Sequence, residues 1–313
     1  MKDIWIIGTG IIAQEYSKIL FDLGVKFTVI GRSPINVEKF NSFYPSTAVA
    51  GGISNYLDQQ PSLPEAVIVA ADIESLFSIS KELIEFGVKK ILIEKPGVLN
   101  LEEGEKLHGI SKKYQCDIFI AYNRRFFSST IKAKEIITND GGLLSLAFDF
   151  TEWSHIIGKL EKPKAVLSKW LIANSSHVVD MSFYLGGFPK EIVCFHRGGL
   201  PWHTSASQFT GAGITDYNVV FSYHANWESP GRWGIELMTK KHKIYFRPLE
   251  TLSIQKIGSV EVEDVFLESE LDKTYKPGFF LQTKKFIEGD FAELCSLGRQ
   301  IEFMSVLNKI GNY

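Results

Sequence analysis

Short apolar runs alternate with helical patterns over the first 122 residues. Residues 4–7 form an apolar run that leads directly into Gly8-Thr9-Gly10, and apolar residues then recur at helical spacing over 11–23, before Gly24. Further strands are predicted at 26–30, 47–50, 66–71, 89–94 and 117–122, with helices at 75–86 and 101–114. Short strands separated by helices predict right-handed βαβ units and a parallel sheet that is buried on both faces.

The pattern changes after residue 122. A helix is predicted around 131–138, and runs rich in alternating, β-branched and aromatic residues follow at 144–152, 191–196, 217–227, 233–239 and 243–247. Such runs favour an antiparallel sheet with one covered face. One helix is predicted at 176–185, and another from about 279 to 310. We therefore expect a Rossmann domain in residues 1–122 and a second domain in residues 123–313.

Composition and charge exclude several classes of protein. Hydrophobic residues make up 45% of the 313 residues and charged residues 22%, which is typical of a globular chain. The net charge is −2, so no basic excess is available to neutralise a nucleic-acid backbone. The apolar runs are far shorter than the ~20 residues that a bilayer span requires. We expect neither a nucleic-acid partner nor a membrane.

The cysteine and histidine patterns indicate neither disulfides nor a metal site. The three cysteines are scattered and form no Cys-x-x-Cys pair, and the seven histidines show no metal-ligand spacing. The N-terminus runs straight into a strand, so we expect no secretory signal. A reducing, cytoplasmic location is the simplest interpretation.

The glycine turn after the first strand predicts a dinucleotide site. Gly8-Thr9-Gly10-Ile11-Ile12-Ala13 matches G-x-G-x-x-[GA] between a strand and a helix. The first glycine permits the tight turn, the second lets backbone N–H groups approach a pyrophosphate, and Ala13 allows close packing of the helix. The residues expected to line the dinucleotide are Gly8, Thr9, Gly10, Ile11, Ile12, Arg32, Ser33, Ala71 and Asp72.

The end of the second strand favours NADP over NAD. An acidic residue there usually accepts from the ribose 2′-hydroxyl of NAD, but this chain has Gly31-Arg32-Ser33. A guanidinium makes paired, charge-assisted bonds to phosphate, and Ser33 adds a hydroxyl donor. If Arg32 is only a solvated surface side chain, NAD stays possible.

Several segments together resemble the Gfo/Idh/MocA oxidoreductase family. Glu94-Lys95-Pro96 ends the predicted fifth strand, and Asn123-Arg124-Arg125-Phe126 follows the sixth. Lys169-Trp170 precedes a histidine-bearing helix that begins Ser175-Ser176-His177. Gly278-Phe279-Phe280-x-Gln282 and Gln300-Ile301-Glu302 extend the resemblance nearly to the C-terminus. It implies an α/β Rossmann domain joined to an α+β domain with a large, mostly antiparallel sheet, which serves substrate binding and oligomerisation. The Asn-Ser-Ser-His form resembles a branch associated with bacterial surface-polysaccharide synthesis.

The resemblance also implies the chemistry. Substrates of the family are commonly sugars, sugar nucleotides and inositols, and many members are dimers or tetramers, so we expect a homodimer or homotetramer. Lys95 would stabilise an oxyanion and His177 would act as general acid and base. Asp180, three residues further on the same helical face, would orient the His177 ring or bind a substrate hydroxyl. Glu94, Lys95 and Asn123 would border the cofactor. The candidate substrate residues are Arg124, Arg125, Trp153 and Asn174, with Trp170 and His155 as weaker ones.

One departure from the family pattern bears on activity. Members that carry the Lys–Asp–His set read Asp-x-Gly-x-His, whereas here Ala173 stands four residues before His177 and Ser175 replaces the glycine. Asn174, the nearest polar residue, cannot ionise. We therefore expect an NAD(P)-dependent oxidoreductase that acts on a CH–OH group of a carbohydrate. Two alternatives stay open: a glycosidase-type enzyme that uses bound NAD, and a non-catalytic dinucleotide sensor.

Overall fold

The computed structural model describes residues 3–44 and 47–313. Met1 and Lys2 lie outside this part of the chain. They belong to the predicted Rossmann domain and to the N-terminal segment that was expected to hold no secretory signal. The described residues form two compact units. The first contains the chain up to Tyr122 together with Phe279–Glu302, and the second contains Asn123–Gly278 and Phe303–Tyr313. The return of Phe279–Glu302 to the first unit differs from the simple division after residue 122.

The first unit is built on a seven-stranded sheet in the order β15-β6-β5-β4-β1-β2-β3. All of its pairs are parallel except β15 with β6. The four residues of β4 are completely buried, as the continuous apolar run predicts. The parallel strands are β1 (Asp3–Ile7), β2 (Lys26–Ile30), β3 (Ala48–Val49), β4 (Ala66–Val69), β5 (Lys90–Glu94) and β6 (Asp117–Ala121).

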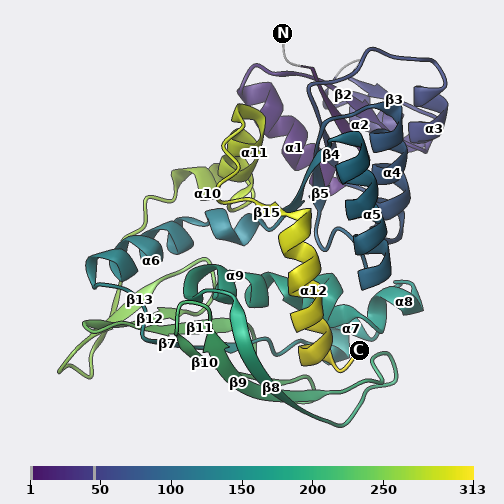
Figure 1. Cartoon of the computed structure of the whole chain (residues 1–313). Coiled ribbons are helices and arrows are strands. Elements are labelled where there is room, and N and C mark those ends of the chain that lie inside the picture. Colours follow the sequence, from purple (N-terminus) through teal and green to yellow (C-terminus); the bar gives the residue numbers. More distant parts are fainter. Residues whose placement is uncertain (1–2, 45–46) are drawn as a thin grey trace. The chain divides into compact units, whose positions relative to one another are not determined.

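Helices cover both faces of this sheet, with α1 beside α11 and α4 beside α5 (Figure 1). Asn100 caps the N-terminus of α5, because its side chain accepts from the N–H of Glu103 at 2.8 Å. The short helices α2 and α3 are additions to the sequence prediction. The helices are α1 (Ile11–Asp22), α2 (Pro34–Asn41), α3 (Gly52–Leu57), the 3-10 helix η1 (Ile73–Ser75), α4 (Leu76–Phe86), α5 (Leu101–Tyr114) and α11 (Phe279–Glu288).

The single helix predicted from 279 to 310 is wrong. The chain forms α11, then strand β15 (Cys295–Ser296), then α12 (Leu297–Gly311). Gly289 follows α11 with a φ of +81°, a conformation that ends a helix. Cys295 pairs with Ile120 at the edge of β6, which adds the antiparallel strand to the sheet.

The second unit holds an eight-stranded sheet in the order β14-β13-β12-β11-β7-β10-β9-β8. Only the β7–β10 pair is parallel, so the prediction of a large, mostly antiparallel sheet is confirmed. The strands are β7 (Ser145–Asp149), β8 (Pro189–Arg197), β9 (Gln208–Thr215), β10 (Val220–Asn226), β11 (Gly234–Met238), β12 (His242–Phe246), β13 (Ser253–Lys256) and β14 (Val262–Asp264).

Helix α9 (Ser176–Gly186) covers one face of this sheet (Figure 1). Phe183 on the helix packs edge-on against Phe148 of β7 and Phe221 of β10, with ring centroids 5.5 and 5.1 Å apart. Residues of β10 are alternately exposed and buried, so the opposite face of the sheet is open. The unit is completed by η2 (Asn123–Phe126), α6 (Ser128–Asn139), α7 (Ser154–Ile157), α8 (Lys164–Leu167), the π-helical turn η3 (Leu171–Ser175) and α10 (Glu270–Thr274).

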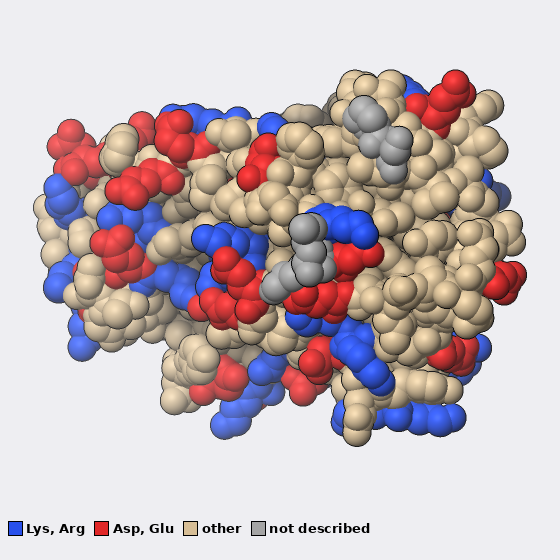
Figure 2. Space-filling model, turned by 90° about the horizontal axis from the view of Figure 1, so that it is seen from above, with Lys and Arg blue, Asp and Glu red and all other residues tan. Residues whose placement is uncertain are grey.

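Charged side chains of both signs are mixed on the face shown in Figure 2, where neither sign forms a continuous patch. Within residues 3–44 and 47–313, no helix has the length and apolar character needed to cross a membrane.

Candidate functional site

The turn between β1 and α1 has the geometry of a phosphate-binding loop. Gly8 has a φ of +124°, and a Cβ placed there would lie 2.2 Å from the carbonyl oxygen of Ala70, so only glycine fits. A Cβ on Gly10 would meet nothing within 4 Å, which leaves open space beside the N-terminus of α1. No side chain caps this helix and its first turn has no acidic residue. The free N–H groups and the open space fit a pyrophosphate.

The predicted adenosine end of the site brings Arg32 and Asp72 together. Arg32 Nη2 lies 3.0 Å from Asp72 Oδ2, and both side chains are largely exposed. Ser33 caps α2, since its hydroxyl accepts from the N–H of Asn36 at 3.4 Å. The chain thus has no acid directly after β2, but Asp72, after β4, supplies a carboxylate to the same place.

Buried polar side chains hold the Glu94-Lys95-Pro96 segment at the end of β5. The Tyr16 hydroxyl donates to Glu94 Oε1 at 2.6 Å and accepts from Gln282 Nε2 at 3.2 Å. Gln300 Nε2 donates to the carbonyl oxygen of Pro96 at 2.9 Å. Burial and the nearby Glu94 charge raise the pKa of Tyr16, so it stays a proton donor. The half-buried Lys95 therefore stands between Glu94, whose side chain Tyr16 holds, and Pro96, whose carbonyl Gln300 holds.

The sequence analysis did not identify Gln282 and Gln300 as residues that hold the Glu94-Lys95-Pro96 segment. Both stand in segments that carry the family resemblance, but their partners are 266 and 204 residues away in the chain. Both side chains are fully buried, which for glutamine requires such partners.

In the second unit, His177 stands at the start of α9, directly after the π-helical turn η3, and is 6% exposed. Asp180 on the same helix accepts from Arg125 Nε at 2.9 Å and Nη2 at 2.6 Å. Burial raises the pKa of Asp180, and the Arg125 guanidinium counteracts this shift. The structure thus pairs two predicted site residues, a catalytic and a substrate candidate, with each other.

A buried carboxylate next to the His177 turn is the main residue that the sequence analysis missed. Glu152 is 2% exposed, and its Oε1 accepts from Asn174 Nδ2 at 2.8 Å and Ser175 Oγ at 2.7 Å. Its Oε2 accepts from Arg232 Nη1 at 3.1 Å. Burial raises the pKa of Glu152. An acidic group therefore contacts the turn that contains Ala173. It comes from the segment after β7 and not from the turn itself.

Aromatic rings link Glu152 to His177. The Arg232 guanidinium lies over Trp153 and Trp233, 5.0 and 4.6 Å from their ring centroids. Arg124 lies over Trp233 at 5.0 Å, and the His177 ring centroid is 6.4 Å from that of Trp233. The structure therefore places four predicted residues, Arg124, Trp153, Asn174 and His177, in one cluster.

Other candidates have local structural partners. Asn123, predicted to border the cofactor, donates to the carbonyl of Pro277 at 2.9 Å. Trp170 packs edge-on against Trp202 in the interior. His155 lies in the short helix α7, beyond the end of β7.

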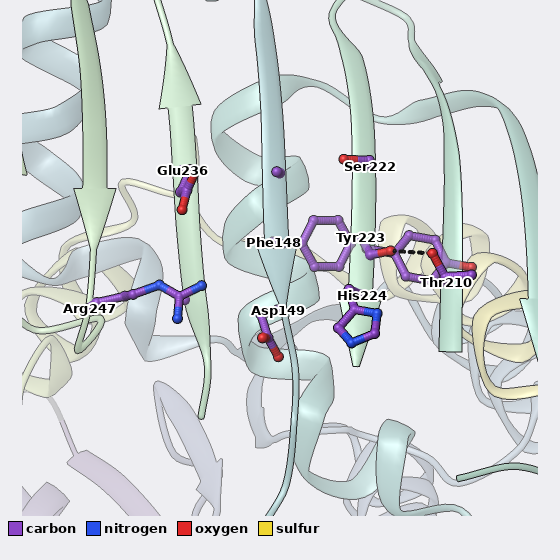
Figure 3. A pocket seen from close by; sticks show the side chains of 10 residues that line it. Phe148, Asp149, Thr210, Ser222, Tyr223, His224, Glu236 and Arg247 are labelled. Carbon is purple, nitrogen blue, oxygen red and sulfur yellow. Dashed lines mark hydrogen bonds between the residues drawn. The ribbon is translucent and has the colours of Figure 1, made fainter. Parts of the chain in front are cut away.

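The open face of the eight-stranded sheet carries a separate cavity of about 330 Å³ (Figure 3). Asp149, Ser222, His224 and Arg247 line it, and Thr210 Oγ1 donates to the carbonyl of Tyr223 at 3.1 Å. None of these residues was predicted as a site. No group of three or more His, Cys, Asp or Glu within the described residues is arranged to hold a metal ion.

A protein-family model matches the first unit. Residues 2–122 match the model of the Gfo/Idh/MocA family, described as an oxidoreductase family with an NAD-binding Rossmann fold. No curated protein gives a significant match to the chain.

Solved structures match the whole fold at low sequence identity. A dehydrogenase from Clostridium difficile is 20% identical with a TM-score of 0.78, and the match covers 99% of each chain. A levoglucosan dehydrogenase in complex with NADH and L-sorbose is 14% identical, with a TM-score of 0.79, over 99% of this chain and 96% of that one. A UDP-N-acetylglucosamine 3-dehydrogenase from Acidithiobacillus ferrooxidans is 15% identical, with a TM-score of 0.74, over 98% and 96%. The shared fold includes both sheets.

Proposed function

We propose that this chain, whose Rossmann domain belongs to the Gfo/Idh/MocA oxidoreductase family, transfers a hydride between a nicotinamide dinucleotide and a CH–OH or ketone carbon of a sugar or sugar nucleotide. The observation that carries the proposal is the Gly8–Gly10 turn, which has open space beside Gly10 and leads into a helix that no side chain caps. The sugar class follows the substrates printed for the solved structures of the same fold.

In this proposal two side chains handle charge and protons. The Lys95 ammonium hydrogen-bonds the substrate oxygen and stabilises the negative charge that develops on it. His177 takes the hydroxyl proton in oxidation and returns it in reduction. The nicotinamide, when bound, accepts or supplies the hydride. The buried bond from Gln300 to the Pro96 carbonyl supports the backbone next to Lys95 for this role.

The direct test separates cofactor binding from turnover. We expect Lys95→Met and His177→Ala to lower turnover by about 100-fold or more, while the Kd for the cofactor changes by less than about threefold. Nicotinamide fluorescence reports binding, and absorbance at the nicotinamide band reports turnover with levoglucosan, L-sorbose and UDP-N-acetylglucosamine. Lys81→Met and His108→Ala are controls on surface helices. A wild-type protein that binds neither NAD(H) nor NADP(H) would refute the proposal.

We further propose that NADP is the preferred cofactor and that Asp72 limits this preference. Arg32→Ala should weaken NADPH binding by about 10- to 100-fold and NADH binding much less, since a bond to a charged group contributes about 1.5–3 kcal/mol. Asp72→Asn should strengthen NADPH binding, because it removes the carboxylate that now occupies Arg32. Equal weakening of both cofactors by Arg32→Ala would remove the 2′-phosphate argument.

A further inference from the structure

The π-helical turn η3 leads directly into α9, which begins with Ser176 and His177, so the position of the turn sets the position of the His177 side chain. The first N–H groups of any helical segment have no partner within that segment. Trp170 precedes η3, and its side chain does not cap the turn. Because π-helical turns are frequent at functional sites, the groups that hold this turn bear on the role of His177.

Side chains from elsewhere in the second unit hold both ends of the turn. At its last residues, Glu152 accepts from Asn174 and Ser175. At its first residue, the N–H of Leu171 donates to the hydroxyl of Tyr313 at 3.2 Å, across 142 positions in the chain. The Tyr313 hydroxyl therefore satisfies an N–H group that cannot have a partner inside the turn.

A buried histidine orients the Tyr313 hydroxyl. His203 is fully buried, with Nδ1 2.7 Å from the carbonyl oxygen of Ala206 and Nε2 2.6 Å from the Tyr313 hydroxyl. A carbonyl only accepts, so Nδ1 carries the hydrogen of the neutral ring and Nε2 accepts from Tyr313. Burial lowers the pKa of His203 and raises the pKa of Tyr313, which keeps the ring neutral and the hydroxyl protonated. The lone pairs of the Tyr313 oxygen are thereby left for the N–H of Leu171.

The Tyr313 ring is itself held in place. Lys169, two residues before the turn, has its Nζ 3.9 Å from the ring centroid, which is a cation–π contact. Asn312 Nδ2 donates to the carbonyl of Ser205 at 2.9 Å, and Ser205 Oγ donates to the carbonyl of Gly311 at 3.0 Å. These contacts fix the segment that carries Tyr313, so its hydroxyl is an acceptor in a defined place.

From these contacts we propose that Tyr313 is a positioning residue for His177. Its hydroxyl, oriented by His203, holds the first residue of η3, as Glu152 holds the last residues, and the two contacts together fix the start of α9. The proposal rests on the proposed function, because this positioning serves the proton transfer assigned there to His177.

Hydrogen exchange in the full-length protein, followed by mass spectrometry, tests whether Tyr313 holds the turn. Tyr313→Phe keeps the ring over Lys169 but removes the acceptor of the Leu171 N–H. Peptides that cover residues 171–177 should then exchange about fivefold faster or more, as expected for one lost hydrogen bond. Tyr245→Phe, which removes a hydroxyl bonded to Gln255 in the same unit, is the matched control and should leave these peptides unchanged. Unchanged exchange in Tyr313→Phe would overturn the proposal.

A double-mutant cycle with His177 separates positioning from a general loss of structure. Tyr313→Phe should lower kcat with levoglucosan, L-sorbose or UDP-N-acetylglucosamine by about 10- to 100-fold, because a small displacement of a reacting group is enough for such a loss. The Kd for the cofactor should change by less than about threefold. In the His177→Ala background, Tyr313→Phe should lower kcat by no more than about twofold, since the residue that it positions is absent. Equal falls in the two backgrounds would show a general defect and would contradict the proposal.

A pair of His203 variants gives a second test if Tyr313→Phe folds poorly. His203→Gln places an oxygen near the position of Nε2 and can still accept from Tyr313, whereas His203→Asn keeps only the donor toward Ala206. We expect kcat to be about fivefold lower in His203→Asn than in His203→Gln. The opposite order would also overturn the proposal. Failure of the proposed function is seen separately, as a wild-type protein that binds neither NAD(H) nor NADP(H).

Discussion

The Glu152 carboxyl accepts hydrogen bonds from three side chains while only 2% of the residue is exposed. Burial raises its pKa, so the folded protein holds this proton more tightly than the unfolded chain. The resulting stabilisation is complete below the ordinary glutamate pKa of about 4.3 and is lost as the pH rises through the raised value. Glu152→Gln is always neutral. The stability of this variant relative to wild type should therefore increase as the pH rises above about 4.3.

Urea unfolding at several pH values measures this difference, and Glu228→Gln is the matched control. The pKa of Glu228 is lowered by its hydrogen bonds, so its contribution is present above the ordinary pKa and is lost as the pH falls. Its variant should show the opposite dependence on pH. Parallel curves for the two variants would contradict the assignment of Glu152 as a carboxyl destabilised by burial.

The sequence predicts residues whose chemistry depends on a local motif and misses those that depend on distant partners. Gly8 and Gly10 could be assigned because a strand, a tight turn and a helix are adjacent in the chain. The pairing of Arg125 with Asp180 joins residues 55 positions apart, and Glu152 meets Ser175 across 23 positions. The available signal for Glu152 was a charged residue that continues the alternation of the buried Phe148 and Phe150.

The segment formed by α11, β15 and the start of α12 completes the Rossmann unit. Phe279 packs on Tyr16, and Phe286 on Phe119, with ring centroids 5.0 and 6.3 Å apart.

Two strands lack a clear alternating pattern in the sequence. Strand β15 has only two residues, and β9 contains Gly211 and Gly213. The glycines of β9 leave room for the rings of Tyr223 and Phe221, contacts that no local pattern reveals.

Because Gln300 at the start of α12 donates to Pro96, this element should support both stability and turnover. Gln300→Leu leaves the buried Pro96 carbonyl without its donor and should cost about 1–3 kcal/mol of unfolding free energy. Turnover should fall more than cofactor affinity, since Lys95 precedes Pro96. Arg299→Ala, which removes an exposed ion pair with Glu302, should cost only about 0–1 kcal/mol. Equal losses in urea unfolding for the two variants would show that the bond to Pro96 contributes nothing.

At the scale of the whole molecule, the fold class follows from periodicity, because a change from helix-linked strands to alternating strands is visible along the chain. The assignment of residues 279–302 to the first unit does not follow from periodicity, because tertiary contacts bring this segment back to that unit. Nor does periodicity say what covers the open face of the second sheet. There, Phe195, Thr210, His224 and Asp149 form one row across β8, β9, β10 and β7.

This open face is the surface through which we propose that the chain forms its homo-oligomer. Phe195 and Val193 are 63% and 60% exposed, and Val220 on β10 is 50% exposed, so apolar side chains extend over several strands. Asp149 and Arg247 provide charges of both signs on the same face, which allows self-complementary pairing about a two-fold axis (Figure 3).

Phe195→Asp combined with Val193→Asp should convert the oligomer into a particle of the 35.3 kDa monomer mass in light scattering. Phe43→Asp, at an exposed position of the first unit, should leave the mass unchanged. A double variant that retains the wild-type mass would place the interface elsewhere. A monomeric wild-type protein would show that this face does not bury the roughly 1,000 Å² that a stable interface needs.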